Sequence, residues 1–221
     1  MTVTVPKSHQ QPIVFVVDDD ISVRESLELL IKFAGWQPET FASAEEFLAR
    51  PRTASPSCMV LDVSLPDLNG LELQKLIGTD RVDMPIIFIT GHGDVPMTVQ
   101  AMKAGAVEFL TKPFDDEVLL SAIRHAIKRS TAVLDDQAEI MTLRSSYDSL
   151  TPREQEVMRL VVAGMLNKQI GLELRISEIT VKAHRGKVMQ KMKADSVADL
   201  VKTAVKLGLS PAKNPWHTTN R

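Results

Sequence analysis

Five short strand patterns, most of them apolar runs, alternate with helical patterns over residues 12–128 of this 221-residue chain, and this alternation limits the possible folds more than any other feature. The strand patterns are Ile13–Val17, Glu39–Phe41, Cys58–Leu61, Pro85–Ile89 and Val107–Leu110, of which Glu39–Phe41 is the weaker one. The segments between them and after the last one, such as Ser22–Ala34, carry apolar residues at helical spacing. Strands that alternate with helices form a parallel sheet with helices on both faces. We therefore predict a doubly wound α/β domain with a five-stranded parallel sheet.

The second half of the chain carries helical patterns and no strand pattern. Thr151-Pro152-Arg153-Glu154 places an N-cap residue, a proline at the first helical position and a capping-box glutamate in the order that opens a helix. Three further helices are predicted over residues 167–174, 177–193 and 196–208. The sequence therefore predicts a small all-α domain of four helices after the α/β domain.

The domain borders follow from these patterns. We expect the α/β domain over residues 12–128, the all-α domain over 149–208, and tails at 1–11 and 209–221. Residues 129–148 are polar, contain no proline or glycine, and show only a loose apolar spacing. They are interpreted as an interdomain linker, and the sequence leaves open whether this linker continues the preceding helix.

Charge is divided unevenly between the two parts of the chain. The formal net charge is −2, but residues 1–149 carry a net charge of −9 and residues 150–221 a net charge of +7. A basic domain attracts polyanions, of which DNA is the commonest. A basic surface that contacts only solvent has the same composition, so charge alone does not decide between these interpretations.

No stretch of the sequence approaches the roughly 20 apolar residues of a transmembrane helix, so we expect no membrane partner. Met1–Pro12 is polar and lacks the apolar core of a secretory signal. The single cysteine, Cys58, cannot form an internal disulfide, and it is interpreted as a small buried side chain. These features favour a protein of the reducing cytoplasm.

Polar residues stand where four of the predicted strands end. They are Asp18-Asp19-Asp20 after the first strand, Asp62 after the third, Thr90 after the fourth and Lys112 after the fifth. Parallel strands deliver their carboxyl ends to one edge of a sheet, so these side chains are expected to meet. Clustered carboxylates repel one another and favour a hard cation such as Mg²⁺. Such a site suits phosphoryl transfer with a carboxylate as the covalent acceptor.

Each of these residues also has an ordinary structural explanation. An aspartate run after a strand often caps the next helix, Asp62 could lie in a turn, and Thr90 could cap a helix. Lys112-Pro113 could belong to a surface loop. Such residues at four strand ends of one sheet are less easily explained by coincidence, so we favour a shared site.

Three segments of the first part resemble the receiver domain of bacterial response regulators: VVDDDISVRESL, MVLDVSLPDLNGLEL and PIIFITGHGDVPMTVQAMKAGAVEFLTKPF. The resemblance covers about residues 12–128. It implies that Asp62 accepts a phosphoryl group from a sensor histidine kinase. It also implies that Mg²⁺ is bound by Asp18, Asp19, Asp62 and the backbone carbonyl of Ser64.

The same resemblance implies roles for residues near the last two strands. Thr90 and Lys112 contact the phosphoryl oxygens, and Phe109 takes the place of the aromatic switch residue. The Lys112-Pro113 peptide bond is expected to be cis. Asp20 lies outside the acid pair and is assigned to capping the following helix.

In the second part, a short turn joins two predicted helices within NKQIGLELRISEITVKAHRGKVMQKMKADS. Val181, Val188 and Met192 share one face of the second helix and are expected to pack in the core. Basic residues lie on the opposite side, and a helix with an apolar back and a basic front fits the major groove of DNA. A basic, solvated helix in a small bundle is the alternative.

The segments LTPREQEVMRLVVAGMLNKQI and SEITVKAHRGKVMQKMKADS resemble the LuxR-type helix-turn-helix domain over about residues 149–208. Coupled to a receiver, this domain places the chain among FixJ/NarL-type response regulators, nearer to FixJ. The resemblance implies that residues 177–193 form the recognition helix and that the last helix pairs two subunits on DNA. Candidates for contact with bases or phosphates are Lys182 and Arg185, and candidates for contact with the DNA backbone are Lys168, Thr180, His184 and Lys187.

Two residues depart from the pattern of that family. The turn before the recognition helix commonly carries glycine, where this chain has Arg175. If this position needs a positive φ, arginine adds strain. Gly171 stands at a helical position where alanine is commoner, which costs roughly 1 kcal/mol but permits a close approach between helices.

We therefore expect a two-component transcription regulator that catalyses only its own phosphorylation and dephosphorylation. Phosphorylation is expected to promote homodimerisation, binding to promoter DNA and, rather than repression, activation through RNA polymerase. An aspartate-nucleophile phosphatase of the haloacid-dehalogenase type is the alternative, because Asp18 and Asp20 follow a strand, but it leaves Asp62 and the basic half without a role. A third hypothesis is a receiver used only as a binding module, with a second domain that does not touch DNA.

Overall fold

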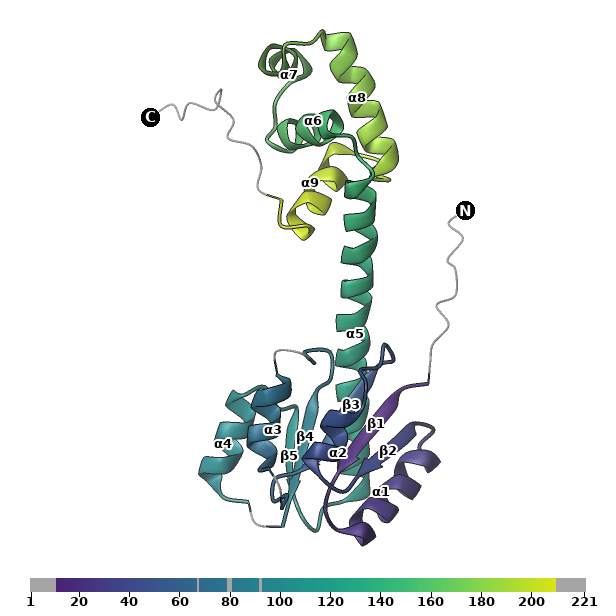
Figure 1. Cartoon of the computed structure of the whole chain (residues 1–221), viewed down its shortest axis with the longest axis vertical. Helices are drawn as coiled ribbons and strands as arrows, with labels where there is room; N and C mark the ends of the chain where they lie inside the picture. The colour runs from purple at the N-terminus through teal and green to yellow at the C-terminus, as the bar shows by residue number, and fades with distance from the viewer. Residues whose placement is uncertain (1–10, 67, 79–80, 92, 210–221) are drawn as a thin grey trace. The chain divides into compact units, whose positions relative to one another are not determined.

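The computed structural model describes residues 11–66, 68–78, 81–91 and 93–209, and Figure 1 shows its helices and strands. The chain divides into two compact units, residues 1–135 and 136–221. Most of the two predicted tails lies outside the described residues. In the part of the chain that the structure describes, no helix is long and apolar enough to cross a membrane.

The first unit contains a five-stranded sheet with the strand order β2-β1-β3-β4-β5. The strands are β1 (Ile13–Val17), β2 (Gln37–Phe41), β3 (Ser57–Asp62), β4 (Ile86–Thr90) and β5 (Glu108–Thr111). All neighbouring strands are parallel, which confirms the predicted sheet. The order reverses direction between β1 and β3, so the carboxyl ends of these two strands flank the crevice where such sheets bind ligands.

Helices cover both faces of this sheet (Figure 1). They are α1 (Ile21–Phe33), α2 (Ala44–Ala49), α3 (Gly70–Ile77), α4 (Val95–Lys103) and α5 (Asp116–Asp148). α2, α3 and α4 contribute Phe47, Leu73 and Ala101 to the core on one face. α1 and α5 contribute Leu27 and Ile123 to the core on the other face, where Cys58 is also buried as predicted. The two cores explain why β1, β3 and β4 are apolar along almost their whole length.

Up to residue 209, where the described part ends, the second unit consists of the end of α5 and four further helices. These are α6 (Pro152–Val162), α7 (Asn167–Leu174), α8 (Glu178–Lys191) and α9 (Val197–Lys206). Thr151 opens α6 with the predicted capping box, and Val181 and Val188 of α8 are buried in the core. Residues 129–148 belong to α5, and Leu143 and Tyr147 near its end pack against this core. The end of the expected linker is thus a structural part of the second unit.

Arg175 lies in the turn between α7 and α8, and Gly171 lies in α7 beside this turn. Arg175 has φ 55° and ψ 45°, a left-handed conformation that glycine adopts at no steric cost. The arginine therefore stores about 1 kcal/mol of backbone strain. A Cβ on Gly171 would lie 2.9 Å from the carbonyl oxygen of Ile176, so the close approach of α7 to this turn requires glycine.

An ion pair involving Glu154 joins α6 to α8. Glu154 Oε2 accepts hydrogen bonds from Lys191 Nζ at 2.7 Å and from the backbone N–H of Thr151 at 2.9 Å. These hydrogen bonds lower the pKa of the buried Glu154 carboxyl from 4.5 to about 2. Because the pKa is lowered by folding, the ionised carboxylate stabilises the folded unit fully above pH 4.5, and this contribution is lost as the pH falls toward 2.

Glu154→Gln is therefore expected to lower the free energy of unfolding of the second unit by about 1–2 kcal/mol at pH 7. The difference from the wild type should shrink as the pH falls from 4.5 toward 2, because the wild-type carboxylate then becomes protonated. Urea unfolding followed by circular dichroism across this pH range measures both effects. Glu173→Gln, which neutralises an exposed glutamate of α7, is the control and should change the stability by less than about 0.5 kcal/mol. Equal losses in the two variants would contradict the stabilising role of Glu154.

Candidate functional site

Side chains from the ends of β1, β3 and β5 meet at the carboxyl edge of the sheet. Lys112 Nζ donates hydrogen bonds to Asp18 Oδ2 at 2.7 Å and to Asp62 Oδ2 at 2.6 Å. Carboxylate oxygens of Asp18, Asp19 and Asp62 lie within 4.8 Å of one another. The Lys112-Pro113 peptide bond is cis, as the receiver resemblance implied. The structure therefore brings together four of the five charged residues that the strand-end pattern predicted to meet.

Backbone amides orient two of the carboxylates. The N–H of Asp20 donates to Asp18 Oδ1 at 2.9 Å, and the N–H of Ser64 donates to Asp62 Oδ1 at 2.8 Å. The Oδ2 atoms of Asp18 and Asp62 are thereby left to face Lys112. The side chain of Asp20 accepts from the N–H of Ser22 and caps α1, as expected, and this hydrogen bond lowers the pKa of Asp20.

Burial and hydrogen bonding shift the pKa values of Asp18 and Lys112 in this cluster. Burial raises the pKa of Asp18 more than the hydrogen bonds from Lys112 and the Asp20 amide lower it, so the net shift is upward. Burial alone would lower the pKa of Lys112, but its hydrogen bonds with Asp18 and Asp62 and the negative charges of these aspartates together outweigh burial and raise it. Lys112 therefore remains a cation, and its charge offsets part of the repulsion between the carboxylates.

The donor set of this cluster fits a small divalent cation. Its carboxylate oxygens are the hard ligands that Mg²⁺ prefers, and Mg²⁺ usually retains several water molecules when it binds a protein. Asp18 and Asp62 are buried, whereas Asp19 is exposed. The cluster is therefore open to solvent on one side, as the entry of a hydrated ion requires.

Thr90 and Phe109 lie on the paired strands β4 and β5. Thr90 is the last residue of β4 and is buried. Phe109 on β5 is half-buried, and its ring centroid lies 6.1 Å from that of Phe88. A Cβ on Gly93 would lie 3.1 Å from the Phe109 ring and 3.3 Å from the Thr90 methyl group, so the loop after β4 passes close to both side chains.

Two residues that the sequence patterns did not indicate also shape the site. Arg24 Nη1 donates to the carbonyl oxygens of Asp18 at 2.7 Å and Asp19 at 2.9 Å. Gly70 approaches the loop after β3 so closely that a Cβ would lie 2.5 Å from the carbonyl oxygen of Asp62. The available sequence signals were a basic residue in the helix after the aspartates and a glycine at the start of the helix after Asp62.

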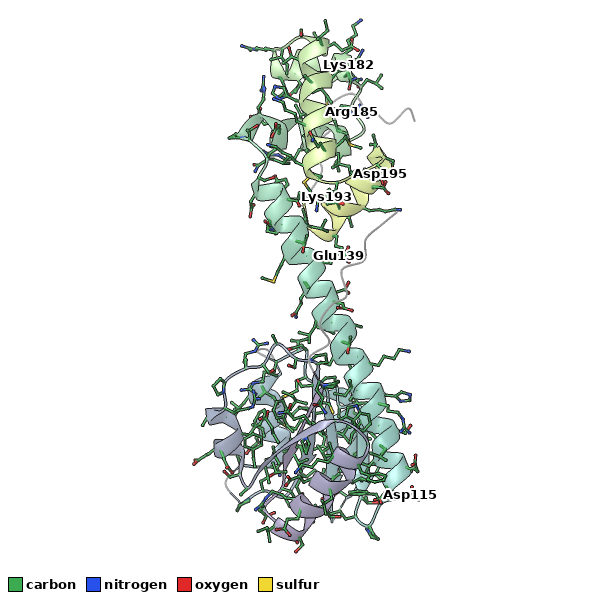
Figure 2. All side chains as sticks on the ribbon, turned by 90° about the vertical axis from the view of Figure 1, so that its right-hand side faces the viewer. Asp115, Glu139, Lys182, Arg185, Lys193 and Asp195 are labelled. Carbon is green, nitrogen blue, oxygen red and sulfur yellow. The ribbon has the colours of Figure 1, made fainter. Side chains whose placement is uncertain are left out.

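In the second unit, the basic residues of α8 that the sequence suggests as DNA contacts differ in their exposure to solvent. Lys182 and Lys187 are exposed, and Lys182 Nζ lies 3.5 Å from a carboxylate oxygen of Glu178. Arg185 is half-buried, and its Nη1 donates to Asn167 Oδ1 at 2.9 Å. Lys182 and Arg185 both project from α8 (Figure 2). The hydrogen bond therefore holds Arg185 toward the start of α7, whereas the lysines extend into solvent.

The remaining candidates differ in their surroundings. Lys168 is exposed on α7. The hydroxyl of Thr180 lies 2.8 Å from that of Ser177, within the cap of α8. His184 is half-buried, and its Nδ1 atom has no hydrogen-bond partner among the described residues. Thr180 and His184 are thus partly covered by the unit itself.

Comparisons with known proteins agree with this geometry. Residues 14–124 match the response regulator receiver domain, and residues 148–204 match the bacterial regulatory proteins of the luxR family. The chain belongs to the response regulators. This response regulator is 50% identical to nodulation protein W of Bradyrhizobium diazoefficiens, over 90% of this chain and 87% of that protein. It is 42% identical to the transcriptional regulatory protein FixJ of Rhizobium meliloti, over 90% of this chain and 98% of that protein.

Comparison with a solved structure also places the chain among the response regulators. The low-resolution structure of the response regulator StyR matches 89% of this chain and 100% of its own, with a TM-score of 0.80 and 46% identity. This response regulator is therefore a DNA-binding transcription regulator. The phosphatase alternative is not supported, because the luxR-family match accounts for the basic half and Asp20 caps a helix.

Proposed function

We propose that this response regulator accepts a phosphoryl group on Asp62 from a sensor histidine kinase. Asp62 Oδ2 attacks the phosphorus of a phosphohistidine, the P–N bond breaks, and the imidazole leaves with its electron pair and takes up a proton. The product is an acyl phosphate on Asp62, which water later hydrolyses. The protein thus catalyses only its own phosphorylation and dephosphorylation. The observation that carries this proposal is the meeting of three carboxylates with Lys112 at the crevice of the sheet.

The residues around Asp62 have separate roles in this proposal. Mg²⁺ would be held by Asp18, Asp19, Asp62 and the backbone carbonyl of Ser64, and when bound it neutralises charge on the phosphoryl oxygens. Lys112, which pairs with two carboxylates in this structure, contacts one phosphoryl oxygen after transfer. The hydroxyl of Thr90 donates to another phosphoryl oxygen.

Phosphorylation adds charge beside Thr90 and Phe109 at the end of the sheet. We propose that these side chains then reorient and shift the population toward a state with a dimer surface on α4, β5 and α5. Homodimerisation joins two DNA-binding units, with α9 of each unit paired, and so raises the affinity for a two-fold promoter site.

The DNA-binding part of the proposal concerns residues 149–208, which follow the receiver unit of residues 12–128 and the connecting residues 129–148. α8 is the recognition helix, in which Lys182 and Arg185 contact bases or phosphates. Residues proposed to contact the DNA backbone are Lys168, Thr180, His184 and Lys187. The dimer activates transcription through RNA polymerase in the cytoplasm, where bacterial promoters are located.

Incubation with acetyl phosphate tests the phosphoryl-transfer step. Wild type and Asp62→Asn are compared with and without Mg²⁺, and adducts are located by intact and peptide mass spectrometry. We expect one Mg²⁺-dependent, acid-stable and base-labile phosphoryl adduct on Asp62, and none in Asp62→Asn. An adduct on Asp18, or hydrolysis of phosphate esters without Asp62, would indicate an enzyme instead.

A further inference from the structure

The exposed face of α8 contains one large apolar side chain, Ile179. In α8, which is described throughout, Val181 and Val188 are buried, whereas Ile179 is 80% exposed. Single exposed apolar residues are common on protein surfaces, so exposure alone assigns no role to Ile179. Its position is more informative, because Ile179 lies in the first turn of α8 and helix-turn-helix proteins contact base edges with the N-terminal residues of this helix.

The neighbours of Ile179 on this face are small or basic. Ile179, Lys182, Ala183 and Gly186 are all exposed, and their spacing of three and four residues places them on one side of the helix. A Cβ on Gly186 would meet no atom within 4 Å, so this part of the helix surface is unobstructed. Small residues at positions 183 and 186 allow the helix backbone to lie close to the edges of the bases.

Other candidate residues on α8 are held within the unit. Arg185 donates to Asn167 of α7, and Thr180 interacts with Ser177 in the cap. In the same two turns of the helix, Ile179 and Lys182 are exposed. An isoleucine cannot hydrogen-bond to a base edge, so its recognition partner must be apolar.

The major groove offers one apolar group to such a side chain, the C5-methyl group of thymine. We infer that Ile179 is a specificity-determining residue that contacts a thymine C5-methyl group in the DNA half-site. This inference rests on the proposed function of α8 as the recognition helix. Contact removes both the isoleucine and the methyl group from water, and removal of one methyl group should weaken binding about fourfold.

Deoxyuridine substitution tests this inference, because deoxyuridine differs from thymidine only by the absence of the methyl group. The full chain, treated with acetyl phosphate and Mg²⁺, first selects a duplex from a random library, and this enriched duplex is the probe. Each thymine is then replaced singly, and binding is measured by fluorescence anisotropy. Wild type is expected to bind at least one substituted duplex about fourfold more weakly than the parent duplex. Ile179→Ala should bind the parent about tenfold more weakly than wild type and should not respond to that substitution.

Controls separate this inference from the proposed DNA binding. Leu29→Ala truncates a side chain of α1 that is 70% exposed, and it should retain the fourfold discrimination of the wild type. Because Ile179 is exposed, Ile179→Ala should unfold in urea at nearly the wild-type midpoint. The inference is overturned if no deoxyuridine substitution weakens wild-type binding, or if Ile179→Ala keeps the discrimination, and DNA binding itself then stands. If no duplex is enriched from the library, the proposed function fails together with the inference.

Discussion

Lys112→Met is expected to lower the free energy of unfolding of the first unit by about 3 kcal/mol at pH 7 without Mg²⁺. The Lys112 ammonium donates to a carboxylate oxygen of Asp18 at 2.7 Å and of Asp62 at 2.6 Å, and both aspartates are buried. Methionine has a similar length, so the substitution removes the charge and keeps most of the side-chain volume. The two carboxylates then repel each other without a neighbouring ammonium, which is the costly way to break a buried ion pair.

Urea unfolding with and without Mg²⁺ measures this effect. Mg²⁺ should recover more stability in Lys112→Met than in the wild type, because a bound cation replaces the missing positive charge. Lys103→Met, which removes an exposed charge on α4, is the matched control and should behave like the wild type. Wild-type stability of Lys112→Met without Mg²⁺ would show that the ammonium does not balance the carboxylates.

The raised pKa of Asp18 leads to a second comparison in the same unfolding experiment. Folding raises the pKa of Asp18 above 3.8 through burial, so stability is lost as the pH rises through the folded pKa. Asp18→Asn should therefore increase the unfolding free energy at pH 7. In the Lys112→Met background it should also recover part of the lost stability, because it removes one of the two repelling charges.

Gly70→Ala is expected to cost about 1–3 kcal/mol of stability and to slow phosphorylation of Asp62 at least about tenfold. A Cβ at this position would lie 2.5 Å from the carbonyl oxygen of Asp62 and 3.0 Å from the Cα of Val63. These are backbone atoms and cannot rotate away, so the connection between β3 and α3 must shift. Such a shift displaces Asp62 relative to Lys112, and displacements of about 1 Å have large effects on reaction rates.

Gly91→Ala is the control for Gly70→Ala. Gly91 also follows a strand of this sheet, but a Cβ there would meet no atom within 4 Å. Urea unfolding should give nearly wild-type stability for Gly91→Ala, and mass spectrometry after acetyl phosphate treatment should show the slow reaction only in Gly70→Ala. Wild-type rates in Gly70→Ala would mean that the loop tolerates the methyl group without moving Asp62.

The helices and strands of both units were largely predictable because the sequence signals that specify them are local. The observed strands agree with the apolar runs to within two residues at each end, since buried parallel strands require continuous apolar sequence. Helix starts were also predictable, because Thr151, Ser177 and Ser196 cap the helices that follow them through short-range hydrogen bonds. The same local patterns predicted that Asp18, Asp62 and Lys112 meet at one edge of the sheet.

Residues 129–148 could not be assigned from sequence because their packing partners lie far along the chain. Leu143 and Tyr147 contact the core of the second unit. Lys206 of α9 donates to Asp136 at 3.2 Å and to Glu139 at 2.7 Å. A loose apolar spacing within one segment does not reveal such partners, so the pattern suited a flexible linker as well as a helix.

The amino-acid sequence by itself determined the type and order of the elements, and therefore which strand ends share an edge, because apolar periodicity and capping act between near neighbours. Tertiary structure alone decided which side chains of one helix remain exposed. Arg185 and Ile179 illustrate this, since Asn167 of α7 accepts a hydrogen bond from Arg185, whereas Ile179 is 80% exposed. Exposure depends on residues brought together from distant positions, and no local pattern contains that information.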